Sequence, residues 1–286
     1  MSGLWSGILR IAIQGELGSN SHMAALAMLG EETGLEIVPC AVSAEVFERV
    51  ESGAVDAAVL PIENSLHGSV AEHYDLLLAR PIRILRESLM RIRHNLIARP
   101  GVTADQIRRV ISHPVALSQC RRWLAQHPQY EAVNFYDTAG SVKHVMAEGL
   151  TDTAGIAPEL AAQQYGANVL EPGIEDHAEN YTRFHLLVRV PAQELAELGT
   201  MGQPDKSSLA FVVLHEPGTL VRALDGFARA GVNLTKIESR PVPGKPWEYV
   251  FFVDVRFERL EQIDGAIEEL SRHCQMVKEL GRYIAA

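Results

Sequence analysis

The stretch ILRIAIQGELGSNSHMAALAMLGEE, residues 8–32, begins the pattern that decides the fold. Its first six residues, 8–13, form a short isoleucine-rich run that predicts a strand, and residues 21–32 have the longer apolar pattern of a helix. The same alternation occurs twice more, with strands expected at 35–42 and 55–61 and helices at 44–51 and 70–79. A βαβαβα order predicts a mostly parallel, doubly wound sheet.

A second alternating series follows an arginine-rich stretch. Residues 82–98 are expected to form one or two extended segments that cross between two lobes. Further strands are expected at 110–112, 132–135 and 154–157, and further helices at 116–126, 141–148 and 159–165. We expect the strands at 169–170 and 184–190 to return to the first sheet. Two lobes joined by crossing strands would form a cleft.

Residues 191–206 lose the apolar periodicity and contain two prolines and two glycines, which predicts a linker. The expected division is therefore a first domain at 8–190, a linker at 191–206 and a second domain at 207–286. The second domain has the expected order strand 208–215, helix 219–230, strand 232–239, strand 249–256, helix 260–271 and strand 276–280. This βαββαβ order predicts an antiparallel sheet with both helices on one face. A domain this small with one bare sheet face usually pairs with another copy.

Composition restricts the class of partner. The chain has 286 residues, with 26 Lys and Arg against 36 Asp and Glu, giving a net charge of −10. An acidic chain disfavours nucleic acid and anionic membranes as partners, because both require a basic surface. Three distant cysteines fit a reducing compartment rather than a disulfide framework or zinc site. The sequence has no signal peptide and no apolar run long enough to span a membrane, so we expect a cytoplasmic protein.

Four segments place small and hydroxyl-bearing residues after a strand and before a helix. They are residues 15–21, 63–69, 113–120 and 137–141. Free backbone N–H groups at a helix start, aided by Ser and Thr hydroxyls, bind carboxylate or phosphate without a lysine. Each segment alone is equally typical of ordinary helix caps. Four at the same end of successive strands favour one shared anionic ligand.

Residues 182–184, Thr-Arg-Phe, lie where the loop 174–181 enters the apolar run 185–190. Side chains alternate along a strand, so Thr182 and Phe184 should share one face and Arg183 the other. Three ordinary strand residues would give the same pattern. A hydroxyl and a guanidinium at a loop–strand junction are nevertheless typical of sites in α/β folds.

These segments together resemble the prephenate dehydratase family. The resemblance is carried, in order, by Pro61-Ile62-Glu63-Asn64-Ser65 with Gly68 and Val70, His113-Pro114 with Ala116-Leu117 and Gln119-Cys120, Asp137-Thr138-Ala139, Tyr165-Gly166, and Asn180 with Thr182-Arg183-Phe184. The C-terminal part is similar to an ACT regulatory domain, with Gly218, Leu220 and Glu238-Ser239-Arg240-Pro241. The resemblance runs from about Arg10 to the C-terminus.

The resemblance implies an α/β catalytic region of two lobes, like a type II periplasmic binding protein, and an α+β ferredoxin-like ACT domain. It implies conversion of prephenate to phenylpyruvate, water and carbon dioxide in phenylalanine biosynthesis, with feedback inhibition by phenylalanine. The expected partners are therefore prephenate as substrate, L-phenylalanine as effector, and further copies of the chain in a homodimer or homotetramer. No cofactor and no metal ion are expected.

The resemblance also assigns residues. Thr182 takes the position of the catalytic threonine. The expected substrate-binding residues are Ser19, Asn64, Ser65, Thr138, Arg183 and Phe184. The expected effector-binding residues are Gly218, Leu220, Glu238, Ser239, Arg240 and Pro241. Two departures from the family pattern are Pro158, where a serine is common, and Thr219, where the regulatory turn commonly has alanine.

The chemistry fits these residue types. Loss of the ring carboxylate as carbon dioxide pushes electrons through the diene and expels the para hydroxyl, so nothing is oxidised. The site must hold two carboxylates and donate a hydrogen bond or proton to the departing oxygen. A threonine hydroxyl is too weak an acid to be a strong proton donor, so it acts electrostatically or a neighbour relays the proton. The relay candidates are His22, His67, His113 and His177.

Two other functions fit the sequence. Arogenate, the aminated analogue of prephenate, would give phenylalanine by the same dehydration. A non-catalytic sensor would share the lobed architecture, because fold does not fix function. A nucleotide-binding enzyme fits poorly, since the chain has neither GxGxxG nor GxxxxGK[ST].

Overall fold

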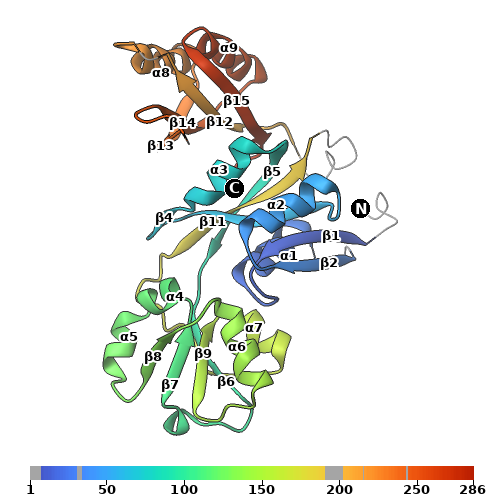
Figure 1. Ribbon diagram of the computed structural model, residues 1–286, viewed down its shortest axis with the longest axis vertical. Coiled ribbons are helices and arrows are strands. Elements are labelled where there is room, and N and C mark those ends of the chain that lie inside the picture. The colour runs from blue at the N-terminus through green and yellow to red at the C-terminus, as the bar shows by residue number, and fades with distance from the viewer. Residues whose placement is uncertain (1–7, 31–33, 191–201, 215, 243) are drawn as a thin grey trace. The chain divides into compact units, whose positions relative to one another are not determined.

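The computed structural model describes residues 8–30, 34–190, 202–214, 216–242 and 244–286. Its contacts divide these residues into two compact units (Figure 1). Unit 1 combines the chain up to Val70 with Leu89–Phe184, and unit 2 combines Ala71–Ser88 with the chain from His185 onward. The division separates α3 from the strand that precedes it. The expected domain boundaries therefore stay a prediction, and residues 191–201 of the expected linker lie outside the described residues.

The first sheet has the strand order β2-β1-β3-β11-β5, and the short β4 pairs with β3. Strands β1, β2 and β3 are parallel, as the βαβ pattern predicts. The elements are β1 (Leu9–Gln14), α1 (Asn20–Leu29), β2 (Leu35–Cys40), α2 (Ser43–Ser52), β3 (Ala57–Asn64), β4 (Gly68–Ser69), α3 (Ala71–Ala79), β5 (Ile82–Arg91) and β11 (Tyr181–Arg189). Strand β3 is buried through its first four residues, typical of a strand covered on both faces. Asn64 at its end therefore sits on a rigid element.

The second sheet has the order β10-β6-β9-β7-β8. Its elements are β6 (Asn95–Ala98), η1 (Ala104–Gln106), β7 (Arg109–Ser112), α4 (Pro114–Gln119), α5 (Arg121–Gln126), β8 (Glu131–Asn134), α6 (Thr138–Ala147), β9 (Thr153–Ala157), α7 (Glu159–Tyr165) and β10 (Asn168–Glu171). Because β5 lies in the first sheet and β6 in the second, the chain crosses between lobes where the arginine-rich stretch predicts it. It returns between β10 and β11.

Two details of the second lobe differ from expectation. The helix expected at 116–126 breaks at Cys120, because a distant residue supplies hydrogen bonds there: the Asp176 backbone N–H donates to the Gln119 carbonyl, and the Asp176 carboxylate accepts from the Arg122 N–H. The strand expected at 169–170 does not return to the first sheet. Gly166 ends α7 in the left-handed conformation, and the short turn leaves β10 antiparallel to β6.

The C-terminal sheet has the order β13-β14-β12-β15, and the pairs β13–β14, β14–β12 and β12–β15 are antiparallel. The elements are β12 (Lys206–Val213), α8 (Thr219–Arg229), β13 (Asn233–Pro241), β14 (Tyr249–Arg256), α9 (Leu260–Ser271) and β15 (Cys274–Tyr283). Both helices pack on one sheet face, where Phe211 and Val253 join Phe227 and Ile263 in one core. The ferredoxin-like βαββαβ prediction is confirmed.

The opposite face of this sheet is partly covered by the same chain, although the sequence suggested that it would be bare. The ring of Tyr74 on α3 lies 5.0 Å from that of Phe252 on β14. The Lys278 ammonium on β15 donates to three carbonyls at the end of α3, those of Leu77, Leu78 and Arg80. These contacts satisfy carbonyls that the helix end leaves open, so α3 is held to the C-terminal sheet.

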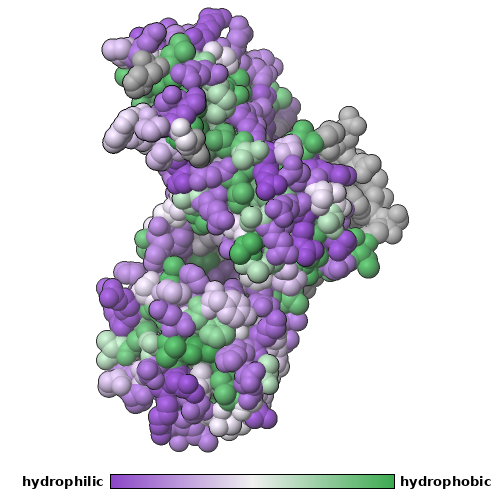
Figure 2. All heavy atoms as spheres, in the orientation of Figure 1, coloured by the Kyte–Doolittle hydropathy of each residue, from purple (hydrophilic) through white to green (hydrophobic). Residues whose placement is uncertain are grey.

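No helix within the described ranges is both long enough and apolar enough to span a membrane. Hydrophilic side chains cover most of the face drawn in Figure 2. This agrees with the acidic composition and the net charge of −10.

Candidate active site

The centre of the candidate site is a hydrogen bond between the ends of two neighbouring strands. Asn64 ends β3 and Thr182 is the second residue of β11. The Asn64 side-chain nitrogen donates to Thr182 Oγ1 at 2.9 Å, to Asn180 Oδ1 at 2.8 Å and to the Tyr181 carbonyl at 3.2 Å. The structure thus joins the expected catalytic residue to one of the expected substrate-binding residues.

The orientation of the Asn64 amide is determined by the backbone. Its Oδ1 accepts hydrogen bonds from the N–H groups of Leu66 at 3.0 Å and His67 at 3.1 Å. A backbone N–H only donates, so the atom facing these two groups is the oxygen. The nitrogen therefore faces Thr182. Asn64 uses both ends of its amide within the protein and acts on the site by holding Thr182.

Ser65 ties the same two chain segments together. Its backbone N–H donates to the Tyr181 carbonyl at 2.8 Å, and its Oγ accepts from the Tyr181 N–H at 3.0 Å. The Ser65 hydroxyl also donates to the Glu179 carbonyl at 3.3 Å. The hydroxyl is thereby engaged with backbone groups of the loop, so its structural role in this state is to fix the entry to β11.

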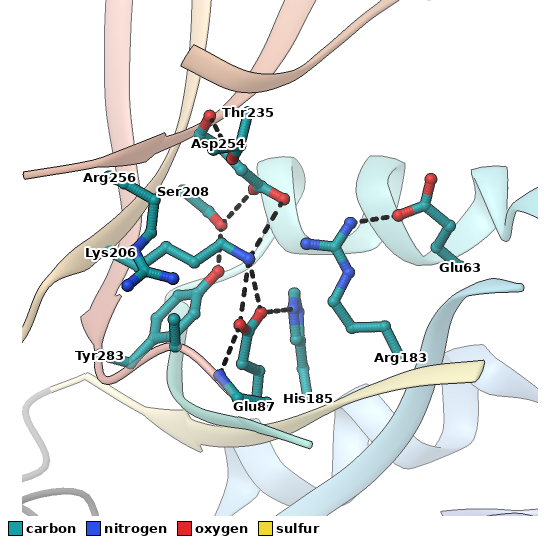
Figure 3. A network of polar contacts seen from close by, with 12 residues as sticks. Glu63, Glu87, Arg183, His185, Lys206, Ser208, Thr235, Asp254, Arg256 and Tyr283 are labelled. Atoms are coloured by element: carbon teal, nitrogen blue, oxygen red, sulfur yellow. Dashed lines mark hydrogen bonds and ion pairs between the residues drawn. The ribbon is translucent and has the colours of Figure 1, made fainter. Parts of the chain in front are cut away.

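Arg183 lies on the other side of β11 from Thr182, as strand alternation predicts. Its guanidinium forms an ion pair with Glu63, the neighbour of Asn64 on β3 (Figure 3). Phe184 is 1% exposed and belongs to the core. The substrate-binding roles assigned to both residues stay predictions, because each has an internal partner or packing place here.

His67 makes the first contact between the two lobes of unit 1. Its Nε2 lies 3.2 Å from Ser118 Oγ, and its Nδ1 lies 3.1 Å from the Gln119 side-chain nitrogen, both on α4. An amide nitrogen only donates, so His67 Nδ1 accepts and Nε2 carries the hydrogen. The segment 63–69 therefore meets the segment 113–120, two of the four hydroxyl-rich segments singled out in the sequence.

The other two segments meet in a second contact between the lobes. The Glu16 carboxylate accepts from Tyr136 Oη at 3.1 Å and from Lys143 Nζ at 2.8 Å. Gly15, at φ +94°, approaches so closely that an added Cβ would lie 2.6 Å from Asp137 Oδ2. Burial, together with nearby Glu16, raises the pKa of the Asp137 carboxyl despite an opposing hydrogen bond from the Gly140 N–H. The loop after β1 and the start of α6 are thus locked together.

Ser19 and Thr138 flank this second contact. Ser19 is 5% exposed and caps α1, its side chain accepting from the His22 N–H at 3.4 Å. Thr138 is the first residue of α6, and the cap of that helix is Asp137. Among the residues that the structure describes, no hydrogen bond connects Ser19 or Thr138 with Thr182. Their substrate-binding roles stay predictions.

The relay candidates have different surroundings. Burial lowers the pKa of His22, whose Nδ1 accepts from the Gly18 N–H at 3.0 Å. His113 caps α4 by accepting from the Val115 N–H. Of the four, His67 is the one that hydrogen bonds link to Thr182 through Asn64, within the described residues. The sequence did not single out His94, which is buried beside Gln119 and whose pKa burial lowers.

The expected effector residues lie at two places in the C-terminal domain. Gly218 precedes α8 with φ +79°, a left-handed conformation that favours glycine, and Leu220 packs against the domain core. Glu238, Ser239, Arg240 and Pro241 form the end of β13. Arg240 makes a two-pronged ion pair with Asp75 on α3, which raises the pKa of the guanidinium. Effector binding by these six residues stays a prediction.

A buried polar network joins β5, β11 and the C-terminal sheet inside unit 2 (Figure 3). The Lys206 ammonium donates to both oxygens of Glu87, at 3.0 and 2.8 Å, and lies 3.9 Å from Asp254 Oδ2. Ser208 donates to Asp254 at 2.6 Å, and His185 Nε2 lies 3.9 Å from Glu87. Charges this deeply buried persist only when paired, so β12 is attached to β5 at one defined position.

Side chains that could hold a metal ion do not gather in groups of three or more His, Cys, Asp or Glu among the described residues. The residues that sequence reasoning missed are the positioning partners Asp75, Glu16 and Lys143. Each is an ordinary charged helix or loop residue, and the sequence carries no signal for it.

The family comparison agrees with this arrangement. Residues 11–192 match the family model for prephenate dehydratase, and residues 207–272 match the ACT domain model. Arogenate dehydratase/prephenate dehydratase 2, chloroplastic, of Arabidopsis thaliana is 38% identical, with 96% of this chain and 72% of the relative covered.

Two solved structures are similar over nearly the whole chain. Prephenate dehydratase of Arthrobacter aurescens in complex with L-Phe is 32% identical with a TM-score of 0.86, covering 97% of this chain and 90% of that one. GqqA, described as a novel type of quorum quenching acylases, is 33% identical with a TM-score of 0.85, covering 97% and 98%. The catalytic region and ACT domain expected from the sequence are confirmed.

Proposed function

Because the chain belongs to the prephenate dehydratase family, we propose that it converts prephenate to phenylpyruvate and that phenylalanine inhibits it. In the proposed reaction the bond between the ring and its carboxylate breaks, and the electron pair enters the ring. The diene shifts and the para C–O bond breaks with its electron pair. The departing hydroxide takes up one proton, so the products are phenylpyruvate, carbon dioxide and water.

The hydrogen bond from Asn64 to Thr182 carries this proposal. Because Thr182 Oγ1 accepts from Asn64 at 2.9 Å, its own hydrogen points away from Asn64 and is directed to another acceptor. In the proposed complex that acceptor is the departing oxygen. A donor held in place before the reaction stabilises the charge that develops in the transition state, and one such donor is worth about 10²- to 10³-fold in kcat.

The proton that completes the leaving water needs a stronger acid than threonine. His67 is the candidate with the most direct connection, because its backbone N–H donates to the Asn64 oxygen, which places its ring beside the site and against α4. In the proposed mechanism Thr182 supplies the hydrogen bond and His67 lies on the route of the proton. Replacing His67 with Gln tests this role, because a variant without that route should show a lower kcat with little change in KM.

Regulation is proposed to act through α3. Arg240, in the segment assigned to phenylalanine, is bound to Asp75 of α3, and Lys278 holds the end of that helix. Helix α3 follows β3 and β4, which carry Asn64 and its loop. An effector carboxylate that took Arg240 from Asp75 would release one of the contacts that hold α3. Phenylalanine would then bind best to a conformation in which α3 has a different position. Inhibition requires such a preference of the effector for one conformation over another. We propose a homodimer or homotetramer as the regulated form.

Arogenate is the alternative substrate, suggested by plant relatives that are named arogenate dehydratase, alone or together with prephenate dehydratase. An acylase would need a base beside the nucleophilic hydroxyl. In the part of the chain described, the hydrogen bond to Thr182 Oγ1 comes from the amide of Asn64, which is not a base. The site chemistry therefore supports the dehydratase and gives no support to an acylase or a sensor.

The deciding experiment supplies prephenate and arogenate separately and quantifies phenylpyruvate and phenylalanine. Phenylpyruvate from prephenate, with kcat/KM at least tenfold above that for arogenate, supports the proposal. If arogenate gives phenylalanine and its kcat/KM is at least tenfold above that for prephenate, arogenate is the substrate in place of prephenate. If the protein turns over neither prephenate nor arogenate, the non-catalytic sensor is the remaining function. Removal of residues 207–286 is unsuitable as a test of regulation, because it would uncover Tyr74 and take away Asp254, a carboxylate beside the buried Lys206 ammonium.

A further inference from the structure

Asn180 is a buried residue with a hydrogen-bond donor that the protein does not use. Its side chain is 1% exposed, and the loop before β11 carries it directly into the candidate site. Among the described residues, no acceptor lies within hydrogen-bond distance of Asn180 Nδ2. A buried donor left without a partner costs about 1–3 kcal/mol, so such groups are rare in proteins and need an explanation.

The identity of the unused atom follows from its neighbours. Two backbone N–H groups fix Asn64 Oδ1, so Asn64 Nδ2 is the atom that faces Asn180 at 2.8 Å. An amide nitrogen only donates, and the facing atom of Asn180 must therefore be its oxygen. Turning the Asn180 amide around would place two nitrogens against each other. The free atom is thus the NH2 group, a donor.

The backbone holds Asn180 in this position on both sides. The Asn180 carbonyl accepts from the Ile92 N–H at 2.7 Å, at the crossing after β5. The next N–H, that of Tyr181, donates to Ser65 Oγ at 3.0 Å. With its side-chain oxygen also bound to Asn64, the residue cannot move its NH2 group to another protein acceptor without breaking one of these bonds.

Thr182 and Asn180 share one partner. Asn64 Nδ2 donates to both Thr182 Oγ1 and Asn180 Oδ1, which leaves each of the two with a hydrogen directed elsewhere. Two preorganised donors held by one shared partner can together stabilise a developing oxyanion. In the dehydration the oxygen that gains charge is the departing para hydroxyl.

We propose that Asn180 Nδ2 is a second donor to the departing oxygen and that, with Thr182 Oγ, it forms a two-donor site for the leaving hydroxide. This assignment rests on the proposed action on prephenate or its amino analogue. The C–O bond breaks with its electron pair on oxygen, both donors keep their hydrogens, and a separate acid supplies the proton that forms water. Asn180 stabilises the charge and does not donate the proton.

The test replaces Asn180 with Asp, which keeps the oxygen facing Asn64 and removes the NH2 group. At pH 8 kcat should fall about 10²- to 10³-fold with a smaller change in KM. Burial raises the pKa of the introduced carboxyl, and its protonated form regains a donor. The kcat of the variant should therefore rise at least about tenfold between pH 8 and pH 5.5, after subtraction of the uncatalysed acid reaction.

Asn95→Asp is the matched control. Asn95 is a buried asparagine of the same unit whose amide nitrogen already has a protein acceptor, the Ala157 carbonyl at 3.1 Å. Its substitution should lower the melting temperature and leave the shape of the kcat profile as in the wild type. Asn180→Leu, which has no donor at any pH, should lose activity without recovery in acid, and it decides the question if Asn180→Asp does not fold.

Each outcome is decisive. Wild-type kcat in folded Asn180→Asp and Asn180→Leu would overturn the assignment and leave the dehydratase function intact. A rise in KM with unchanged kcat would show that Asn180 binds a substrate carboxylate, and this result would also overturn the assignment. Wild-type protein that turns over neither prephenate nor arogenate would refute the proposed function, and the role of Asn180 with it.

Discussion

Arg240 holds the carboxylate of Asp75 in a two-pronged ion pair, with Nε 2.8 Å from Oδ1 and Nη2 2.6 Å from Oδ2. The two residues are 165 positions apart in the sequence. A planar guanidinium binds a carboxylate best in this geometry. Since the carboxylate of an amino acid would bind Arg240 in the same way, Asp75 occupies the place that the proposed effector needs.

Asp75→Asn should make the enzyme more sensitive to phenylalanine. Freeing Arg240 from a partly exposed pair of about 1 kcal/mol lowers the inhibitory concentration about fivefold. Asp225→Asn, which removes an exposed ion pair with Arg229 on α8, should leave it unchanged. Initial rates measured at increasing phenylalanine concentration give the inhibitory concentration for each of the two variants. Unchanged or weaker inhibition in Asp75→Asn would argue against competition for Arg240.

Thr182→Ala should lower kcat about 10²- to 10³-fold with little change in KM, because the lost hydrogen bond acts mainly in the transition state. Thr182→Ser keeps the hydroxyl and should keep most of the turnover. Asn64 retains the Asn180 and Tyr181 oxygens as acceptors, so both variants should fold. Steady-state kinetics with melting curves tests this, and undiminished turnover of the alanine variant would make Thr182 an ordinary strand residue.

Asn64→Asp should be as damaging as loss of the hydroxyl. It sets an acceptor against two others, the oxygens of Asn180 and Tyr181, which costs about 1–3 kcal/mol of stability. Thr182 would then donate its hydrogen to the new carboxylate instead of the substrate. Because the two residues act as one unit, adding Thr182→Ala to Asn64→Asp should lower kcat little further. Fully additive losses in the double variant would show that Asn64 acts independently.

Asp137→Asn should change the pH dependence of stability in a defined direction. The raised pKa of Asp137 means that the folded state binds this proton more tightly than the unfolded state. Its stabilising contribution is present below the unfolded pKa and is lost as pH rises through the folded pKa. The substitution removes one acceptor of a backbone hydrogen bond, so the variant is less stable at pH 4, and the deficit should narrow towards pH 7.

For Asp152→Asn, the stability difference between variant and wild type should change with pH in the opposite direction. A hydrogen bond from Thr153 lowers the pKa of Asp152, whose contribution is therefore present above the unfolded pKa and lost in acid. The small deficit of this exposed-site variant should widen from about pH 2 to pH 5, a range that spans the ordinary carboxyl pKa of about 4. Urea unfolding from about pH 2 to pH 7 measures both variants. Parallel slopes for the two would contradict the assignment of the Asp137 shift to burial.

Turnover should survive exhaustive treatment with a chelator. The substrate itself carries the electron pair that expels the hydroxyl, and the sequence contains no HExxH and no Cys/His cluster at ligand spacing. Activity before and after chelation and desalting is the measurement. Loss of activity that one added divalent ion restores would contradict this expectation.

The sequence by itself determined the architecture. Alternating short and long apolar runs predict α/β lobes, the order after residue 206 predicts the βαββαβ domain, and strand alternation separates Thr182 from Arg183. These features depend on the local pattern of apolar and polar residues, which can be seen in the sequence without knowledge of distant contacts. The motifs also identified the segments that meet in the site, because the ends of strands in one sheet lie near one another.

Only the tertiary structure decided which partners the site residues have. Asn64 and Thr182 are 118 positions apart, and no periodicity predicts that one amide nitrogen joins Thr182 to Asn180. The break at Cys120 likewise depends on Asp176 from a distant loop. Hydrogen bonds of this kind form where crossing strands bring remote residues within about 3 Å. The sequence specifies which groups are available, and the packed chain determines which donors are used within the protein and which remain for a substrate.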